Sequence, residues 1–186
     1  MNIRTLPPDA DAPEVTEWSG KFVEARRRGR WEYASRKNFV GAAVILAIDG
    51  GDVILVEQYR VPLGARCLEL PAGLIGDETG TETEDAIASA TRELAEETGY
   101  AAAHWEVVGE FCSSPGMLSE TFTLVKATGL TRIGEGGGTA HEDIVVHRVP
   151  LASVAAFTAE RRVAGVVIDV KVLTLLGAQL LEDDAQ

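Results

Sequence analysis

A run of closely spaced glutamates constrains this chain more than any other feature. The segment from Arg92 to Gly99 reads Arg-Glu-Leu-Ala-Glu-Glu-Thr-Gly. If it is helical, Glu93 and Glu97 lie one turn apart on the same face, where like charges destabilise an isolated helix by roughly 0.2–0.5 kcal/mol. One interpretation is a solvated acidic face. The other is a cation site, since carboxylates without a neighbouring His or Cys are typical ligands of Mg²⁺ or Mn²⁺.

The flanking residues favour the cation site, because they follow a specific spacing. One acidic residue stands eight positions before the arginine, three more follow it, and a glycine closes the segment. These positions are Glu84, Arg92, Glu93, Glu96, Glu97 and Gly99. This pattern, together with Glu-Leu-Pro-Ala-Gly at residues 69–73, resembles the signature of the Nudix hydrolases, which use Mg²⁺ to hydrolyse a diphosphate linked to another group. Ten residues separate Gly73 from Glu84 where the family has five, so we expect a longer loop before the helix.

The resemblance implies a role for each of these positions. The expected metal ligands combine one backbone carbonyl with several acidic side chains. They are Ala72, Glu84, Glu93, Glu96 and Glu97. Arg92 is expected to orient the carboxylates rather than to contact substrate. The expected ion is Mg²⁺, with Mn²⁺ as the alternative.

A second group of acids follows a glycine-rich segment. Residues 134–138 read Gly-Glu-Gly-Gly-Gly, which predicts a mobile loop, and Glu142 and Asp143 come shortly after it. In the Nudix enzymes that this chain resembles, a glutamate from this loop acts as the catalytic base, and Glu142 is the matching position. A base must reach its water within about 3 Å, which closure of a loop can bring about. The alternative is that both acids lie at a strand edge in solvent.

The substrate-binding prediction depends on residues outside the expected helix that carries Glu93 and Glu97, which we call the metal helix. Trp31, Glu32 and Arg36 lie on an expected strand that resembles the base-binding segment of ADP-ribose pyrophosphatases. Trp31 would stack on a purine, a contact worth ~1–3 kcal/mol, although a strand tryptophan is more often part of a core. Glu32 would accept the adenine amino group, and Arg36 would pair with a phosphate.

Two other segments resemble the same subfamily. They are Gln58-Tyr59-Arg60 and Ser114-Pro115-Gly116. Pro115 lies sixteen residues past Gly99, where ADP-ribose-specific members tend to carry proline. We therefore add Arg60, Pro115 and Gly116 to the expected substrate contacts.

Composition and charge narrow the class of protein. With 186 residues, 46% of them hydrophobic, the chain can bury a full core, and no apolar run approaches the ~20 residues of a membrane span. The start lacks the apolar stretch of a signal peptide, and Cys67 and Cys112 are expected to be reduced, as in the cytoplasm. A net charge of −12 argues against a nucleic-acid partner.

The basic residues are concentrated where an anionic substrate would need them. More than half of them lie between residues 21 and 66. They are Lys21, Arg26, Arg27, Arg28, Arg30, Arg36, Lys37, Arg60 and Arg66. A run such as residues 26–28 is also compatible with a solvated hairpin turn. Arg36 and Arg60 occupy expected strands, so a role in substrate binding is better supported for these two residues.

The pattern of apolar residues predicts one α/β domain with an N-terminal β appendage. Residues 1–17 are expected to be disordered, 18–40 to form a β segment around a hairpin at Gly29, and 41–186 to form the catalytic domain. Helices are expected near 151–160 and 167–181. The Nudix resemblance implies an α/β/α sandwich. An isolated hairpin is marginal in water, and in the subfamily resembled here such an appendage serves dimerisation and base binding, so we expect a homodimer with shared sites.

These observations predict Mg²⁺-dependent hydrolysis of ADP-ribose, a small nucleoside diphosphate substrate, to AMP and ribose 5-phosphate. The first alternative is hydrolysis of another nucleoside diphosphate sugar, such as GDP-mannose. The second is a Nudix-like ligand sensor without hydrolysis. The mutually repelling carboxylates argue against the sensor, because a protein that only binds a ligand does not need them.

Overall fold

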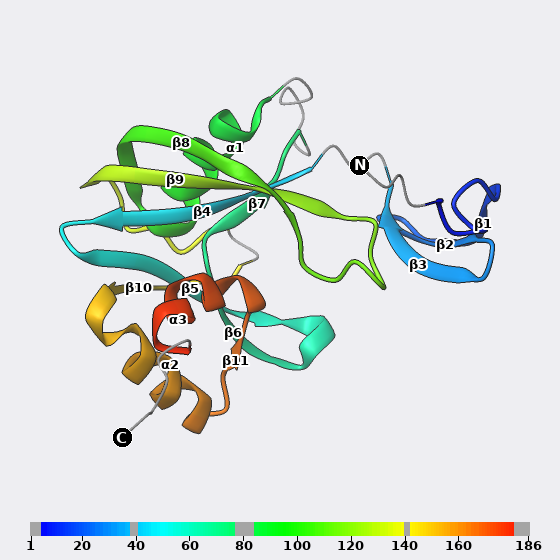
Figure 1. The fold of residues 1–186 in the computed structure, drawn as a ribbon. Helices are drawn as coiled ribbons and strands as arrows, with labels where there is room; N and C mark the ends of the chain where they lie inside the picture. The colour runs from blue at the N-terminus through cyan, green and yellow to red at the C-terminus, as the bar shows by residue number, and fades with distance from the viewer. Residues whose placement is uncertain (1–4, 38–40, 77–83, 140–141, 181–186) are drawn as a thin grey trace.

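The strands of the protein are divided between two separate sheets (Figure 1). The computed structural model describes residues 5–37, 41–76, 84–139 and 142–180. The larger, eight-stranded sheet consists of β4 (Ala42–Asp49), β5 (Asp52–Arg60), β6 (Ala65–Glu69), β7 (Ala72–Leu74), β8 (Tyr100–Cys112), β9 (Thr121–Arg132), β10 (Val145–Pro150) and β11 (Val167–Ile168). The smaller sheet contains β1 (Glu14–Ser19), β2 (Val23–Arg28) and β3 (Trp31–Arg36).

The centre of the larger sheet is buried on both faces. Strands β4 and β5 carry near-continuous apolar runs, as strands covered on both sides do. Its main path runs β11-β6-β5-β4-β9-β8, with β10 paired to β5 and β7 paired to β4. Ile45 packs in a cluster with Leu94 on one face, whereas Leu55 packs with Val154 and Leu176 on the other.

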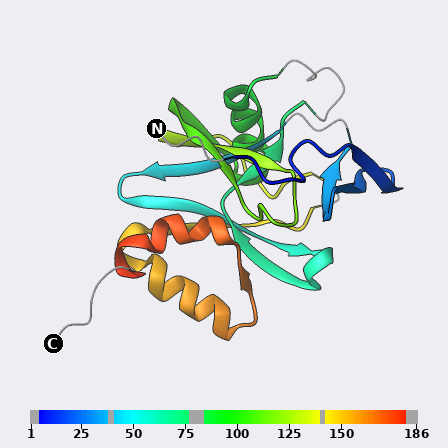
Figure 2. The same cartoon turned by 45° about the vertical axis from the view of Figure 1, so that its right-hand side comes forward.

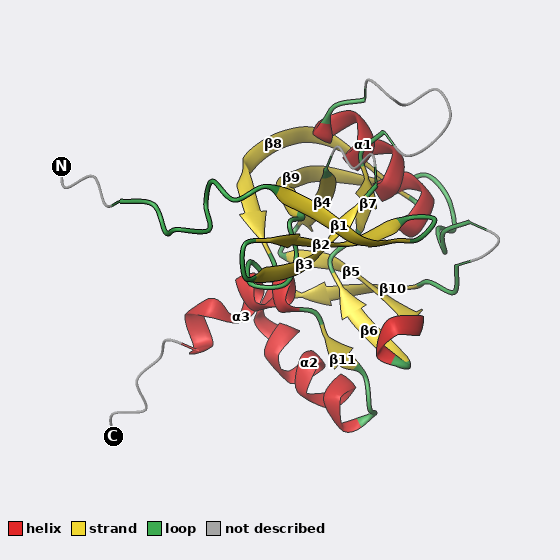
Figure 3. Ribbon diagram, turned by 90° about the vertical axis from the view of Figure 1, so that its right-hand side faces the viewer, coloured by secondary structure: helices red, strands yellow, loops and turns green. Residues whose placement is uncertain are grey.

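Helices cover the two faces of this sheet (Figure 3). The helix α1 (Ala86–Glu93) continues through a wider π-type turn at Leu94–Thr98 and lies on one face. The other face is covered by α2 (Val154–Val163) and α3 (Leu173–Leu180). The expected α/β/α sandwich is therefore confirmed. None of the helices in the described ranges combines the length and apolar character needed to cross a membrane.

Local sequence explains where the metal-helix segment begins and ends. The side chain of Asp85 accepts a hydrogen bond of 2.8 Å from the amide of Ala88, which caps the first turn. Gly99 ends the segment in the left-handed region at φ 72°, a conformation that favours glycine. The helix predicted from the glutamate spacing is therefore present, as α1 and the π-type turn that continues it.

The expected helix at 167–181 is wrong in its first part. Val167 and Ile168 pair in parallel with Cys67 and Leu68 of β6, and Asp169 then caps a short 3-10 turn at Val170–Val172 before α3 begins. Two β-branched residues favour a strand, and the open edge of β6 supplies the backbone partners that a periodicity argument does not consider.

The N-terminal appendage has three strands instead of the two in the expected hairpin. Disorder was expected for residues 1–17, but Glu14–Ser19 forms β1, which pairs with β2 in an antiparallel register. Residues 1–4 lie outside the described ranges. Charged contacts accompany the third strand, since Glu14 contacts Arg26 and Arg28 across the sheet at 2.9 and 3.1 Å.

The appendage lies beyond the end of the larger sheet and contacts it through a narrow connection (Figures 1 and 2). The amide of Ala34 donates to the carbonyl of Met117 at 2.8 Å, and the amide of Ser119 donates to the carbonyl of Ala34 at 3.1 Å. Arg36 also forms an ion pair of 2.6 Å with Glu120. These contacts join β3 to the loop between β8 and β9, the loop that contains Pro115.

Candidate active site

Glu97 is the most buried carboxylate of the helix that carries the acidic segment. Its side chain points beneath β7, where Oε2 accepts a hydrogen bond of 3.0 Å from the amide of Ala72. Burial raises the pKa of Glu97 to about 8. The hydrogen bond from Ala72 and the charge of Arg60 oppose this rise, whereas the nearby charges of Glu93 and Glu142 add to it. A buried carboxylate close to two others is a position where a cation would stabilise the ionised form.

Arg92 holds the other acids of the segment in place. Its guanidinium donates to Glu93 Oε1 at 2.8 Å and to Glu84 Oε2 at 3.3 Å, and it lies 3.5 Å from Glu96 Oε2. It also donates to the carbonyl of Leu74 at 3.4 Å. This arrangement is the geometry expected of a residue that orients carboxylates.

A glycine lets β7 approach this acidic face closely. A Cβ atom added to Gly73 would lie 1.9 Å from Glu93 Oε1, so any side chain there would displace the carboxylate. The Pro-Ala-Gly sequence at 71–73 thus places backbone atoms directly against the predicted metal ligands.

The described residues do not form a ready-made metal cluster. Within them, no three or more His, Cys, Asp or Glu side chains are grouped so that they could hold an ion. Arg92 engages Glu84, Glu93 and Glu96, while Ala72 contacts Glu97 through its amide. The donor set nevertheless fits a hard divalent cation, because it consists of carboxylates, one of them buried with a raised pKa.

The glycine-rich segment is attached to the metal helix, so the expectation of a mobile loop is wrong for its described part. The amides of Gly137 and Gly138 donate to the carbonyls of Glu97 and Glu96 at 2.8 and 3.0 Å. The last carbonyls of a helix lack partners within the helix, and glycines can approach them closely enough to supply donors.

This attachment brings Glu142 towards the acidic face. Its Oε2 accepts hydrogen bonds from the amide and hydroxyl of Thr139 at 2.8 and 3.1 Å, and its charge is one of those that raise the pKa of Glu97. Asp143, next along the chain, turns instead towards Arg66, with 2.5 Å between Oδ2 and Nη1. His141 lies outside the described residues.

A pocket of about 390 Å³ opens beside these acids. We call it the metal pocket, and its charged lining residues are Arg36, Arg60, Glu69, Glu93, Glu120, Glu142 and Lys171. Arg36 was expected to pair with a phosphate and Arg60 to contact substrate, and both line the pocket already paired with a carboxylate. Arg60 makes two bonds of 2.7 Å to the buried Glu69, and Arg36 contacts Glu120.

Sequence reasoning missed three of these lining residues. Glu69 stands within the Glu-Leu-Pro-Ala-Gly motif, which was a usable signal. Glu120 and Lys171 are isolated in the sequence and carry no local pattern. Lys171 reaches the pocket from the turn before α3, held at 2.8 Å by Asp169.

Three of the predicted substrate contacts gather in a different pocket. Trp31, Pro115 and Gly116 line a cavity of about 380 Å³, together with Tyr33 and Leu118. We call it the tryptophan pocket, and none of its described lining residues also lines the metal pocket. Trp31 is 56% exposed, so it is not a core residue. Glu32 is exposed on the same strand and faces Arg27 across the sheet register.

Comparison with known proteins gives concordant results. A family model described as NUDIX domain matches residues 37–163. An ADP-ribose pyrophosphatase from Mycobacterium tuberculosis is 35% identical over 120 residues, which are 64% of this chain and 56% of that protein. A GDP-mannose pyrophosphatase from Cronobacter sakazakii is 33% identical over 172 residues, covering 88% and 82% of the two chains. The chain thus spans about half of the mycobacterial relative and most of the second one.

A solved structure supports the fold assignment. The crystal structure of an ADP compounds hydrolase superposes with a TM-score of 0.64 and covers 90% of this chain and 91% of that one. Its sequence identity of 24% limits the likeness to the fold.

Proposed function

The chain belongs to the Nudix family, and from that premise we propose that it hydrolyses the diphosphate of ADP-ribose to AMP and ribose 5-phosphate with Mg²⁺. The observation that carries the proposal is the charge arrangement of the metal pocket. Glu93 and Glu142 line this cavity together with the cations Arg36 and Arg60. The charges of these two glutamates add to the raised pKa of the buried Glu97. Carboxylates that gather divalent ions, set beside cations, suit a diphosphate better than a neutral ligand.

The first group of residues in this proposal would bind and orient the metal ion. Glu93 and Glu97 would hold the ion, with Glu84, Glu96 and the Ala72 carbonyl as further ligands, and Mn²⁺ would be an acceptable substitute. When bound, the ion would neutralise the diphosphate and lower the pKa of the attacking water. Arg92 would keep the carboxylates oriented, as its contacts with Glu84 and Glu93 support.

Glu142 would act as the general base. It would take a proton from water as the water oxygen bonds to one phosphorus and the bridging P–O bond breaks, releasing the two monophosphates. Its nearness to Glu97 supports this role. Arg36 and Arg60 would bind the phosphates, and their present partners Glu120 and Glu69 would hold the two guanidinium groups in place.

Base recognition is assigned to the tryptophan pocket. An exposed indole beside Pro115 and Gly116 offers a flat surface for a purine. Glu32, the next residue of the strand, points to the opposite face of the sheet and does not line this pocket. Because this pocket shares no described residue with the metal pocket, we propose that the tryptophan pocket serves a second chain in a homodimer, while Arg36 at the end of β3 serves its own chain. Exposed Trp18, Phe22 and Val23 supply apolar surface for such a contact.

Hydrolysis of another nucleoside diphosphate sugar is the second candidate. The GDP-mannose pyrophosphatase from Cronobacter sakazakii matches most of this chain, which is why this substrate class is included in the test. A ligand sensor without hydrolysis is the third candidate, and the repelling carboxylates near Glu97 argue against it. We also propose a cytoplasmic location, which the free thiols of Cys67 and Cys112 support.

A substrate panel tests the proposed function. The protein would be incubated with ADP-ribose, GDP-mannose and other nucleoside diphosphate sugars, with Mg²⁺, with Mn²⁺ or with a chelator. Products would be separated by ion-exchange chromatography. We expect AMP and ribose 5-phosphate from ADP-ribose with the highest kcat/KM, and no product in chelator. A higher kcat/KM for GDP-mannose would move the assignment to the second candidate, and no turnover of any compound would favour the sensor.

A further inference from the structure

A buried carboxylate outside the metal pocket gathers three basic side chains. Glu57 of β5 is 2% exposed. Its Oε1 accepts hydrogen bonds of 2.9 Å from Arg66 and from Arg161, its Oε2 accepts another of 2.9 Å from Arg161, and His147 Nε2 lies 3.3 Å from Oε2. Burial alone would raise the pKa of Glu57, but the bonds from the two arginines outweigh it and the pKa is lowered. Glu57 is therefore a fixed anion.

Arg66 extends from this anchor to the segment that carries Glu142. One of its nitrogens contacts Asp143 Oδ2 at 2.5 Å, and another donates to the backbone carbonyls of Glu57 and Asp143 at 3.1 and 3.2 Å. The Asp143 side chain is 74% exposed, and an exposed ion pair contributes only about 0–1 kcal/mol on its own. Here the guanidinium is already held by Glu57, so little side-chain freedom remains to be lost when it binds Asp143.

The Glu142 segment is thus attached on both sides. Before it, Gly137 and Gly138 are hydrogen-bonded to the end of the metal helix. After it, Asp143 is bonded to Arg66 through both its carboxylate and its backbone. The carboxylate of Glu142 stands between these two attachments.

We propose that Arg66 is a positioning residue for Glu142. Anchored on Glu57, it holds Asp143 and thereby sets where the Glu142 carboxylate stands against the metal helix. This inference rests on the proposed function, in which Glu142 is the base. Arg66 does not line the metal pocket, so its effect would pass through the position of the base. A misplacement of about 1 Å can lower a rate roughly 10²-fold.

The chain offers a matched control in Arg161. Both arginines donate to Glu57, but of the two only Arg66, from β6, contacts Asp143, whereas Arg161 comes from α2. We expect Arg66→Gln to lower kcat about tenfold or more with KM changed less than about twofold. The two substitutions should lower the free energy of unfolding by similar amounts, because each removes one arginine from Glu57. Arg161→Gln should nevertheless leave kcat within about twofold of the wild-type value. Equal losses of kcat in the two variants would overturn the proposal.

A double-mutant cycle asks whether Arg66 acts through Glu142. If it does, Arg66→Gln should have almost no further effect on the residual rate of Glu142→Gln, since the group that it positions is gone. The same fold-loss in both backgrounds would overturn the inference. This comparison needs a measurable rate in the wild type, so an inactive wild type would count against the proposed function. The attachment of Asp143 to Arg66, which we call the tether, is then tested by hydrogen exchange, which needs no activity.

Hydrogen exchange measures the tether without any activity. Peptides covering residues 137–145 should exchange faster in Arg66→Gln than in the wild type and unchanged in Arg161→Gln. If Arg66→Gln does not fold, Asp143→Ala replaces it, because that substitution leaves all three partners of Glu57 in place. Unchanged exchange in folded Arg66→Gln, or in Asp143→Ala, which loses the carboxylate bond and keeps the backbone bond to Arg66, would overturn the tether.

Discussion

The body and the appendage of this protein are stabilised by different interactions. In the body, the central strands bury apolar side chains on both faces, and Val53 and Leu55 of β5 are 0% exposed. In the appendage, all six residues of β1 are exposed, and cross-strand ion pairs such as Arg27–Glu17 connect the strands. Apolar burial contributes roughly 25 cal/mol per Å², whereas an exposed ion pair contributes only about 0–1 kcal/mol. Apolar burial therefore predominates in the body, and exposed polar contacts between strands predominate in the appendage.

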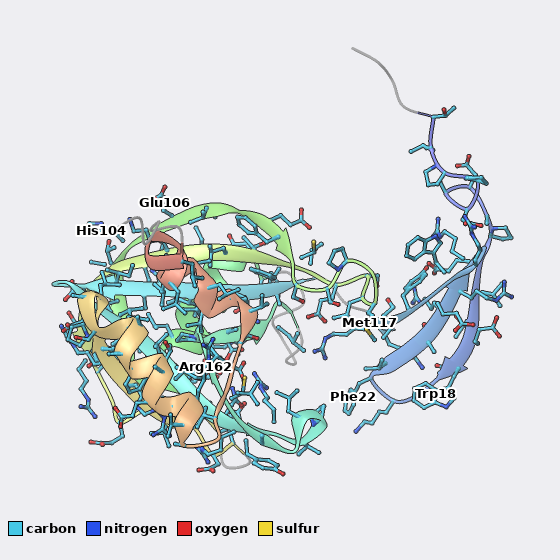
Figure 4. All side chains as sticks on the ribbon, turned by 60° about the horizontal axis from the view of Figure 1, so that its bottom comes forward. Trp18, Phe22, His104, Glu106, Met117 and Arg162 are labelled. Atoms are coloured by element: carbon cyan, nitrogen blue, oxygen red, sulfur yellow. The ribbon has the colours of Figure 1, made fainter. Side chains whose placement is uncertain are left out.

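The same contrast separates the two parts of the proposed reaction. The chemistry is assigned to the body, where Glu97 is buried and held by Ala72. Base recognition is assigned to the appendage, where Trp31 is exposed (two other exposed residues of the appendage, Trp18 and Phe22, are labelled in Figure 4). Substitutions in the body should thus change kcat, and substitutions in the appendage should change KM or assembly.

The largest expected effect lies in the body. Glu97→Gln preserves the shape and the bond from Ala72 but removes a ligand charge, so kcat should fall on the order of 10²–10³-fold. Steady-state kinetics with Mg²⁺ measures this loss, and circular dichroism should show an unchanged fold. Near wild-type kcat in this variant would remove Glu97 from the catalytic assignment and with it the contrast between the two regions.

A complementation experiment tests whether the two regions work together across chains. A Trp31→Ala variant, assayed well below its KM, and a Glu97→Gln variant should each be nearly inactive. Arg36 is left intact because it lines the metal pocket of its own chain. After mixed refolding, heterodimers with shared sites would contain one intact site, giving about a quarter of wild-type activity with random pairing. Light scattering would establish the dimer. A monomer at assay concentration, or proven heterodimers without recovery, would assign each site to a single chain.

A smaller effect is expected from the tryptophan pocket. Trp31→Ala should raise KM for ADP-ribose by the equivalent of ~1–3 kcal/mol and leave kcat nearly unchanged, because stacking on a remote base is similar in the ground and transition states. Trp18→Ala is the matched control, since Trp18 is an exposed appendage tryptophan outside that pocket. Equal changes in KM for the two variants would contradict base stacking at Trp31.

The smallest expected effect concerns stability without metal. Because the pKa of Glu97 is raised to about 8, the folded state resists its ionisation, and wild-type stability should fall as pH rises from about 4.5 to 8. Glu97→Gln should abolish that fall and be more stable near pH 8 by about 1 kcal/mol or more. Urea unfolding in chelator measures it, with Glu96→Gln as a control at a more exposed carboxylate. If Glu97→Gln is less stable than the wild type at pH 8, neighbouring groups of the folded protein already stabilise the ionised Glu97 carboxylate without metal.

Local patterns in the sequence determined the helix of the acidic segment and the strands of the core. The spacing of Glu93 and Glu97 predicted their common helical face, and the apolar runs of 41–49 and 52–60 predicted the central strands. Together with the family resemblance, they also predicted the sandwich. These features depend on residues a few positions apart, so the periodicity of one segment is enough to predict them.

Only the tertiary structure decided which distant residues meet. Arg161 contacts Glu57 across 104 positions of sequence, and Arg36 contacts Glu120 across 84. The bond from Gly137 to Glu97, which contradicts the mobile loop, is also a contact between separate segments. Such pairs depend on strand register and on how helices pack on the sheet, and no local pattern encodes either. The sequence therefore determined the elements and the chemical groups, and the packing decided which partners hold each group in place.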